Sequence, residues 1–146
     1  MSGAVSGIEG KVIVVTGAAS GLGFADARLL ASQGAHVVMT DIDVERGSAL
    51  AKEIGAIFLA HDVSDEDRWG QVMLDVEAKY GRLDGLVNNA GVAHIANIEN
   101  TSSKVWRNTM AIHLDGTFFG CQAAIKLMKK SGGGSGCESD ERYCNP

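Results

Sequence analysis

The stretch KVIVVTGAASGLG, residues 11–23, joins an apolar run directly to a turn with three closely spaced glycines. Residues 12–16 are all β-branched, which is typical of a strand buried on both faces of a parallel sheet. Gly17, Gly21 and Gly23 follow at once, and beyond them apolar residues recur at helical spacing. A buried strand, a glycine turn and a helix in this order predict the first unit of an α/β fold.

The same alternation of strand and helix continues along the chain. Strands are expected at 11–17, 35–41, 56–62 and 83–91, and helices at 21–33, 44–54, 64–80 and 102–130. Connections this short require right-handed crossovers and a parallel sheet that carries helices on both faces. The sequence therefore predicts a doubly wound α/β fold with the first four strands of a Rossmann sheet.

Local signals set the ends of the predicted helices. Asp43 and Ser64 are expected to cap the second and third helices at their N-termini, and Gly55 is expected to end the second. The first helix has an apolar spacing formed by Leu22, Ala25 and Leu29. One face of the fourth helix carries Trp106, Met110, Leu114, Phe118, Cys121, Ile125 and Met128.

Composition excludes several classes of partner. The net charge of −5 at pH 7 argues against nucleic acid and against an anionic membrane surface. No stretch reaches the ~18 apolar residues that span a bilayer, and the first ten residues carry no basic leader, so the cytoplasm is the expected compartment. The three cysteines and four histidines lack ligand spacing, so no metal site is expected.

The glycine turn predicts a site for a dinucleotide. Gly17 permits a sharp turn, Gly21 lets a diphosphate approach the backbone, and Gly23 allows the helix to pack closely on the strand. Free N–H groups and the helix dipole then face the phosphates. Any tight turn between a strand and a helix can use glycines, but the position inside a strand–helix–strand unit favours binding.

Asp41 lies at the end of the second predicted strand, 20 residues after the second glycine of the turn. A carboxylate there can accept hydrogen bonds from the adenosine ribose and repel a 2′-phosphate, which favours NAD over NADP. The alternative is that Asp41 or Asp43 caps the next helix, and we assign that role to Asp43. Arg46 can reach towards a 2′-phosphate, but neither Ser20 nor Ile42 supplies a base beside the ribose.

These features together resemble the short-chain dehydrogenase/reductase family. The resemblance rests on TGAASGLG (16–23), Asp41, HDV (61–63), LVNNAG (86–91) and the helix that begins near Trp106, and it covers residues 10 to about 135. It implies hydride transfer between NAD and an alcohol or ketone substrate, and oligomers built partly on helix 102–130.

The resemblance also implies roles for particular residues. Asp62 and Val63 would contact the adenine, and the Asn89–Gly91 segment would line the cofactor, whereas a strand-ending turn is the alternative for Asn88 and Asn89. The candidate cofactor-binding residues are Gly17, Ser20, Gly21, Leu22, Gly23, Asp41, Ile42, Asp62, Val63, Asn89, Ala90 and Gly91.

His113 is the candidate catalytic residue. The family places an asparagine inside the long helix, where the backbone is distorted and holds a water of a proton relay. This sequence has HLDG at 113–116, so His113 occupies that place. A packed or solvated histidine is the alternative.

The final stretch, KKSGGGSGCESDERYCNP (129–146), departs from the family pattern. The resemblance requires a fifth strand that ends in a serine, followed by a helix with Tyr-x-x-x-Lys. Ser139 has no β-branched run around it, and no lysine follows Tyr143. We therefore expect an N-terminal extension (1–9), an incomplete dinucleotide-binding domain (10–135) and an unrelated polar tail (136–146), with the fourth strand left as an edge.

The expected function is the NAD(H)-binding portion of an oxidoreductase, without turnover by this chain alone. A noncatalytic NAD-binding module is one alternative. Another is a nonfunctional product of truncation, a reading-frame change, alternative splicing or an expression artefact. A methyltransferase is disfavoured, because the glycine spacing occurs together with the NNAG sequence.

Overall fold

A computed structural model describes residues 7–138 and the side chains as far as Gly136. The expectations for Ser139, Tyr143 and the other residues of 139–146 lie outside the described residues. The elements are β1 (Val12–Thr16), α1 (Gly21–Ser32), β2 (His36–Asp41), α2 (Val44–Ile54), β3 (Ile57–Ala60), α3 (Glu66–Tyr80), β4 (Gly85–Asn88), η1 (Ile98–Asn100), α4 (Ser103–Met110), η2 (Ala111–Asp115), α5 (Gly116–Lys130) and β5 (Ser135–Glu138).

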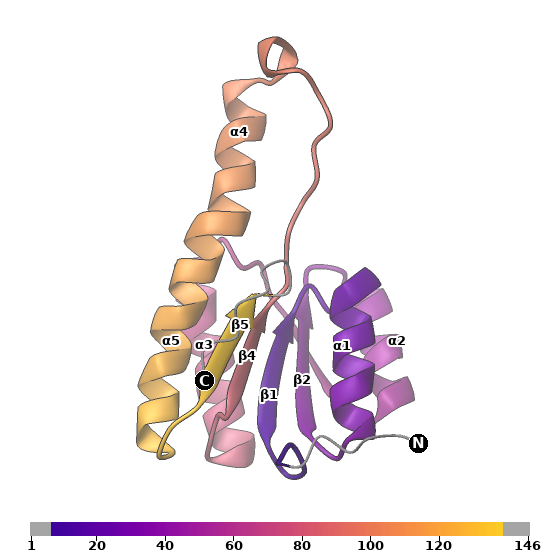
Figure 1. Ribbon diagram of the computed structural model, residues 1–146, viewed down its shortest axis with the longest axis vertical. Helices are drawn as coiled ribbons and strands as arrows, with labels where there is room; N and C mark the ends of the chain where they lie inside the picture. Colours follow the sequence, from indigo (N-terminus) through magenta and orange to yellow (C-terminus); the bar gives the residue numbers. More distant parts are fainter. Residues whose placement is uncertain (1–6, 139–146) are drawn as a thin grey trace.

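The sheet is parallel, and its strand order is β3-β2-β1-β4-β5. From β1 the chain first adds strands in one direction and then returns to add β4 and β5 on the other side. Helices α1 and α2 cover one face of the sheet, and α3 and α5 cover the other (Figure 1). The predicted doubly wound α/β architecture is therefore confirmed.

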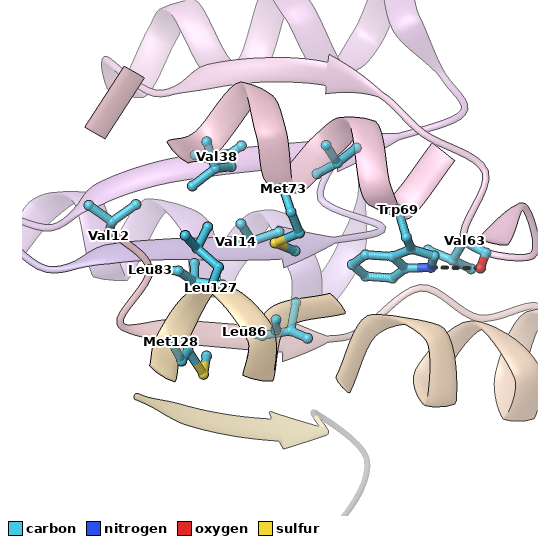
Figure 2. Close-up of a cluster of buried hydrophobic side chains, with 13 residues drawn as sticks. Val12, Val14, Val38, Val63, Trp69, Met73, Leu83, Leu86, Leu127 and Met128 are labelled. Carbon is cyan, nitrogen blue, oxygen red and sulfur yellow. Dashed lines mark hydrogen bonds between the residues drawn. The ribbon is translucent and has the colours of Figure 1, made fainter. Parts of the chain in front are cut away.

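Strand β1 supplies side chains to both cores of the molecule. Val12 and Val14 pack with residues of α3 and α5, whereas Ile13 and Val15 pack with residues of α1 and α2. Figure 2 shows the first of these cores, in which Trp69 lies against the end of the sheet. Because successive side chains of a strand point to opposite faces, an uninterrupted β-branched run fills both layers.

The structure corrects the expectation that the sheet stops at the fourth strand. Residues 135–138 form β5, which pairs in parallel with all four residues of β4. Gly133 and Ser135 redirect the chain after α5 by donating backbone hydrogen bonds to Met128 O (2.9 Å) and Asp84 O (2.9 Å). The sequence of β5 has little strand propensity, so the open backbone of β4, rather than side-chain preference, supports the pairing.

Capping explains where α2 and α3 begin and end. Asp43 accepts a hydrogen bond from Arg46 N at 3.0 Å, as the sequence predicts for α2. The prediction that Ser64 caps α3 is wrong, because Asp65 accepts from Arg68 N at 3.1 Å instead. Both helices end at glycines with left-handed backbone conformations, Gly55 and Gly81.

The predicted long helix is continuous but contains a π-helical segment, η2, between α4 and α5. It packs through small residues: a Cβ atom on Gly120 would lie 2.7 Å from the ring of Trp69. The predicted apolar face is largely exposed, including Trp106, Leu114, Phe118 and Ile125. Helix α1 also packs through small residues, because Gly23 and Ala27 are buried while Leu22 and Leu29 are exposed.

Asp84 ties β1 to β4 at the amino ends of the strands. Its Oδ2 accepts hydrogen bonds from Val12 N (2.9 Å) and Arg82 Nε (2.9 Å), and Lys11 Nζ lies 3.6 Å from Oδ1. The side chain is only 9% exposed. Burial by itself raises the pKa of Asp84, but the hydrogen bonds from Arg82 and Val12 and the charges of Arg82 and Lys11 outweigh it, so the pKa is lowered.

Asp84→Asn should lower the free energy of unfolding at neutral pH by about 1–2 kcal/mol, because the hydrogen bond from Val12 N loses its charged acceptor and the attraction to Arg82 and Lys11 is lost. The folded-state pKa of Asp84 is lowered, so its contribution is present above the unfolded pKa and disappears as pH falls through the folded value. Urea unfolding should therefore show the variant and the wild type converging in acid.

Glu53→Gln, at an exposed position of α2, is the control and should leave stability unchanged. Equal unfolding free energies for Asp84→Asn and the wild type at neutral pH would contradict this role for Asp84.

Candidate functional site

A groove with a volume of about 1180 Å³ lies at the carboxyl ends of the strands. The carboxyl ends of β1 and β4, where the strand order reverses, are the usual ligand site of open α/β sheets. The predicted residues at the groove are Gly17, Ser20, Gly21, Leu22, Asp41, Ile42, Asp62, Val63, Asn89, Ala90, Gly91 and His113. Gly23 alone among the predicted site residues is not part of the lining.

The glycine turn is shaped by close contacts on one side and open space on the other. Gly17 has a φ of 63°, and a Cβ there would lie 2.7 Å from Ala90 Cα. A Cβ on Gly23 would clash with the Asn89 amide and the carbonyl oxygen of Gly17. Gly21 has a φ of 53° and no atom within 4 Å of its Cβ position, so the backbone there is open to a ligand.

The N-terminus of α1 faces this groove and has no acidic residue in its own first turn. Ser20 is the N-cap, and its side chain makes no capping hydrogen bond. The positive end of the helix dipole and the first N–H groups are therefore available to an anion. Together with the open backbone at Gly21, this arrangement fits a diphosphate.

Thr16 and Asn89 join the ends of β1 and β4. The Thr16 hydroxyl oxygen accepts hydrogen bonds from Asn89 N and Ala90 N, both at 3.0 Å. The Asn89 side-chain amide donates to Thr16 O (3.0 Å) and Gly17 O (3.2 Å). Sequence reasoning missed Thr16, although a polar residue at the end of a fully apolar strand must find partners when it is buried.

Asp41 lies at the end of β2, and both of its carboxylate oxygens are engaged. Oδ2 accepts from Ala19 N at 2.9 Å and Oδ1 accepts from Asp43 N at 3.0 Å. An ionised carboxylate has about four lone-pair sites, so each oxygen can accept a further hydrogen bond. Among the residues that the structure describes, no lysine or arginine lines the groove.

The turn after β3 brings Asp62 and Val63 to the groove. Asp62 Oδ1 accepts from Ser64 N (2.9 Å) and Ser64 Oγ (2.6 Å), which fixes the turn and leaves Oδ2 for other partners. The carbonyl oxygen of Val63 accepts from Trp69 Nε1 at 2.9 Å (Figure 2). The Val63 side chain is mostly buried, so little of it meets the groove.

His61 is a buried lining residue that sequence reasoning did not select. Its Nδ1 lies 3.1 Å from Thr40 Oγ1, and its ring meets the Trp69 ring edge to face, with 4.3 Å between the ring centroids. Its Nε2 has no hydrogen-bond partner among the residues that the structure describes. Burial, followed by the charge of Arg68, lowers the pKa of His61 to about 4, although Asp62 and Asp65 oppose the shift. The imidazole is therefore neutral at pH 7.

His113 lies within the π-helical segment η2, at the place where the sequence predicts a helix distortion. Its Nε2 is 3.0 Å from Val92 N and 2.8 Å from Val92 O. Accepting from the N–H and donating to the carbonyl require different protonation states of Nε2, so only one of these bonds forms at a time. The imidazole links the helix to the segment that follows β4.

Further lining residues come from that segment and the long helix. They include Val92, Asn108, Ile112, Thr117 and Phe118. Their positions depend on how the long helix crosses the sheet, so no local sequence signal identifies them.

Within residues 7–138, no group of three or more histidine, cysteine, aspartate or glutamate side chains is arranged to hold a metal, and no helix is long and apolar enough to cross a membrane.

Comparisons with known proteins agree with this architecture. A family model described as short chain dehydrogenase matches residues 11–135. D-threitol dehydrogenase of Mycolicibacterium smegmatis is 44% identical over 133 residues, which are 88% of this chain and 51% of that protein. NADP-dependent (R)-specific alcohol dehydrogenase of Lentilactobacillus kefiri is 38% identical over 132 residues, which are 88% of this chain and 52% of that protein.

A third relative, 3-beta-hydroxysteroid dehydrogenase of Comamonas testosteroni, is 40% identical over 128 residues. That match covers 86% of this chain and 50% of the relative. The chain thus spans about half the length of the curated relatives it matches.

The buried neutral His61 should make the protein less stable in mild acid. The unfolded chain takes up a proton near pH 6.5, whereas the folded chain does so only near pH 4, so stability is full above pH 6.5 and falls towards pH 4. The loss should be at most ~3 kcal/mol. NMR titration of the His61 ring, together with urea unfolding at several pH values, measures both effects.

His61→Phe should flatten the pH dependence in this interval, whereas His94→Phe, at an exposed loop position, should leave it unchanged. A His61 ring that titrates at its ordinary pKa in the folded wild type would refute the expectation, even if the His61 variant does not fold.

Proposed function

The chain belongs to the short-chain dehydrogenase family, and on that basis we propose that its groove binds a nicotinamide dinucleotide, with NAD(H) preferred over NADP(H). The observation that carries the proposal is the convergence of the glycine turn, Asp41, the Asp62 turn and the Asn89–Gly91 segment on one groove. These features come from the carboxyl ends of four different strands. A dinucleotide is long enough to use all of them.

Each part of the groove suits a different part of the dinucleotide. The diphosphate would lie at the N-terminus of α1 and the open backbone of Gly21. The adenosine ribose would lie at Asp41 and the adenine near Asp62 and Val63. The segment Asn89–Gly91 would line the remainder, where the bound nicotinamide would supply hydride exchange.

The preference for NAD(H) rests on charge. The carboxylate of Asp41 would accept hydrogen bonds from ribose hydroxyls and repel a 2′-phosphate. No lysine or arginine among the described lining residues offsets that repulsion. The name of the relative from Lentilactobacillus kefiri states dependence on NADP, so the family accommodates both cofactors and the choice depends on local residues.

The whole protein would transfer hydride between this cofactor and an alcohol or ketone. Family chemistry requires a serine and a Tyr-x-x-x-Lys pair, and Tyr80 is followed four residues later by Asp84 rather than by a lysine. We therefore assign cofactor binding to these 146 residues and no turnover to them alone. In a complete protein, His113 would connect the distorted helix to a proton relay.

A second copy of the chain is the proposed partner of the long helix. Trp106, Leu114, Phe118 and Ile125 form an exposed apolar stripe along α4, η2 and α5. Four large exposed apolar residues on a single helix face favour an interface over a solvated surface. Because Leu114 and Phe118 also line the groove, a partner on this stripe would lie directly beside the cofactor site.

NADH titration, followed by fluorescence, tests the cofactor assignment. The wild type should bind NADH more tightly than NADPH. Gly23→Ala should weaken binding by at least about tenfold, because its methyl group displaces Asn89 and the Gly17 carbonyl and so distorts the phosphate-binding turn.

Gly70→Ala is the matched control, since a Cβ there meets no atom within 4 Å and the position lies on the exposed side of α3. It should bind NADH as the wild type does. Absence of NADH binding, or a strong preference for NADPH, would overturn the assignment.

Turnover on a panel of secondary alcohols with NAD separates binding from catalysis. We expect cofactor binding without product formation from this chain. Robust turnover would show that residues 139–146, or a group in the groove, supply the missing acid–base function.

A further inference from the structure

The carboxylate of Asp41 is built into the framework of the glycine turn. Its Oδ2 accepts a hydrogen bond from Ala19 N at 2.9 Å. Ala19 is in the middle of the turn, and only 2% of its surface is exposed. Its neighbour Ala18 donates its N–H to Thr40 O at 3.1 Å, so the end of β2 holds two successive residues of the turn.

The second carboxylate oxygen fixes the direction of the Asp41 side chain. Oδ1 accepts from Asp43 N at 3.0 Å, which holds the carboxylate between the turn and the start of α2. A side chain gripped by two backbone donors on different segments has little rotational freedom. The position of Ala19 is therefore determined by the carboxylate and is not merely adjacent to it.

We propose that Asp41 is a positioning residue for the phosphate-binding turn, in addition to its role beside the ribose. This proposal rests on the function proposed above. If Asp41 is removed, the N–H of Ala19 loses its acceptor in a buried position, and the turn must shift to find another. Ser20 and Gly21, which follow directly and face the diphosphate, would shift with it.

If Asp41 anchors the turn, its charge is not the only property that determines the choice between NADH and NADPH. If Asp41 acted only by charge, every neutral replacement would admit NADPH to the same extent. If Asp41 also anchors the turn, a replacement that keeps an oxygen acceptor should admit NADPH better than one that has none. Asp41→Asn and Asp41→Ala both remove the charge, and of the two only asparagine retains an oxygen acceptor, together with an NH2 donor.

Amide hydrogen exchange in the ligand-free chain tests the anchoring directly. Asp41→Ala should speed exchange at Ala19 by at least about tenfold, and Asp41→Asn should give an intermediate rate, because a charged hydrogen bond is lost or weakened. Asp43→Asn is the matched control, because it removes one charge two residues away while retaining an N-capping side chain. It should leave exchange at Ala19 unchanged.

Cofactor titrations of the same variants test the consequence. Asp41→Ala should weaken both NADH and NADPH binding, and its affinity for NADPH should be lower than that of Asp41→Asn. Protection of Val14 and Val38 amides, at the centre of the sheet, serves as the check that each variant is folded.

Unchanged exchange at Ala19 in both Asp41 variants would overturn the proposal, as would equal gains in NADPH affinity for Asn and Ala. If the wild type binds neither cofactor, the proposed function fails. Exchange at Ala19 still decides whether Asp41 anchors the turn, because that measurement needs no ligand.

Discussion

Hydrogen bonds from Asn89 N and Ala90 N to the Thr16 hydroxyl join the carboxyl ends of β1 and β4, where the strand order reverses. They extend the β1–β4 pairing, which lies between the two halves of the sheet. The groove lies at the carboxyl ends of these two strands. The same contacts place the glycine turn, because the Asn89 side chain donates to Thr16 O and Gly17 O. Fold and site therefore share one set of interactions.

A carboxylate links neighbouring segments at each end of the sheet. At the amino ends, the Asp84 carboxylate ties β1 to β4 through an ion pair with Lys11 and a hydrogen bond from Val12 N. At the carboxyl ends, Asp41 plays a comparable part between β2 and the glycine turn, where the backbone stays open to a ligand. The carboxylate at the amino ends and the carboxylate at the carboxyl ends have separate hydrogen-bond partners, so each can be altered without the other.

Much of this arrangement could be predicted from the sequence, because its signals are local. The β-branched run 12–16, the glycine turn and the acid at the end of β2 depend on the residue types at each position. They predicted the fold correctly and selected residues that line one groove. Other features depend on tertiary context. Strand β5 forms on the open edge of β4 despite a weak sequence, and α5 packs through Gly120 rather than through its large apolar residues. Thr16 and His61 matter because of what surrounds them once the chain is folded.

The most direct test of the account is to map NADH onto the chain by NMR chemical shifts. We expect shifts at the amides of Ser20, Gly21, Asp62 and Ala90, and none near Arg82 at the opposite edge of the sheet. Shifts confined to the smaller groove between α3 and α5, which has a volume of about 440 Å³, would contradict it, and so would the absence of any shift at saturating NADH.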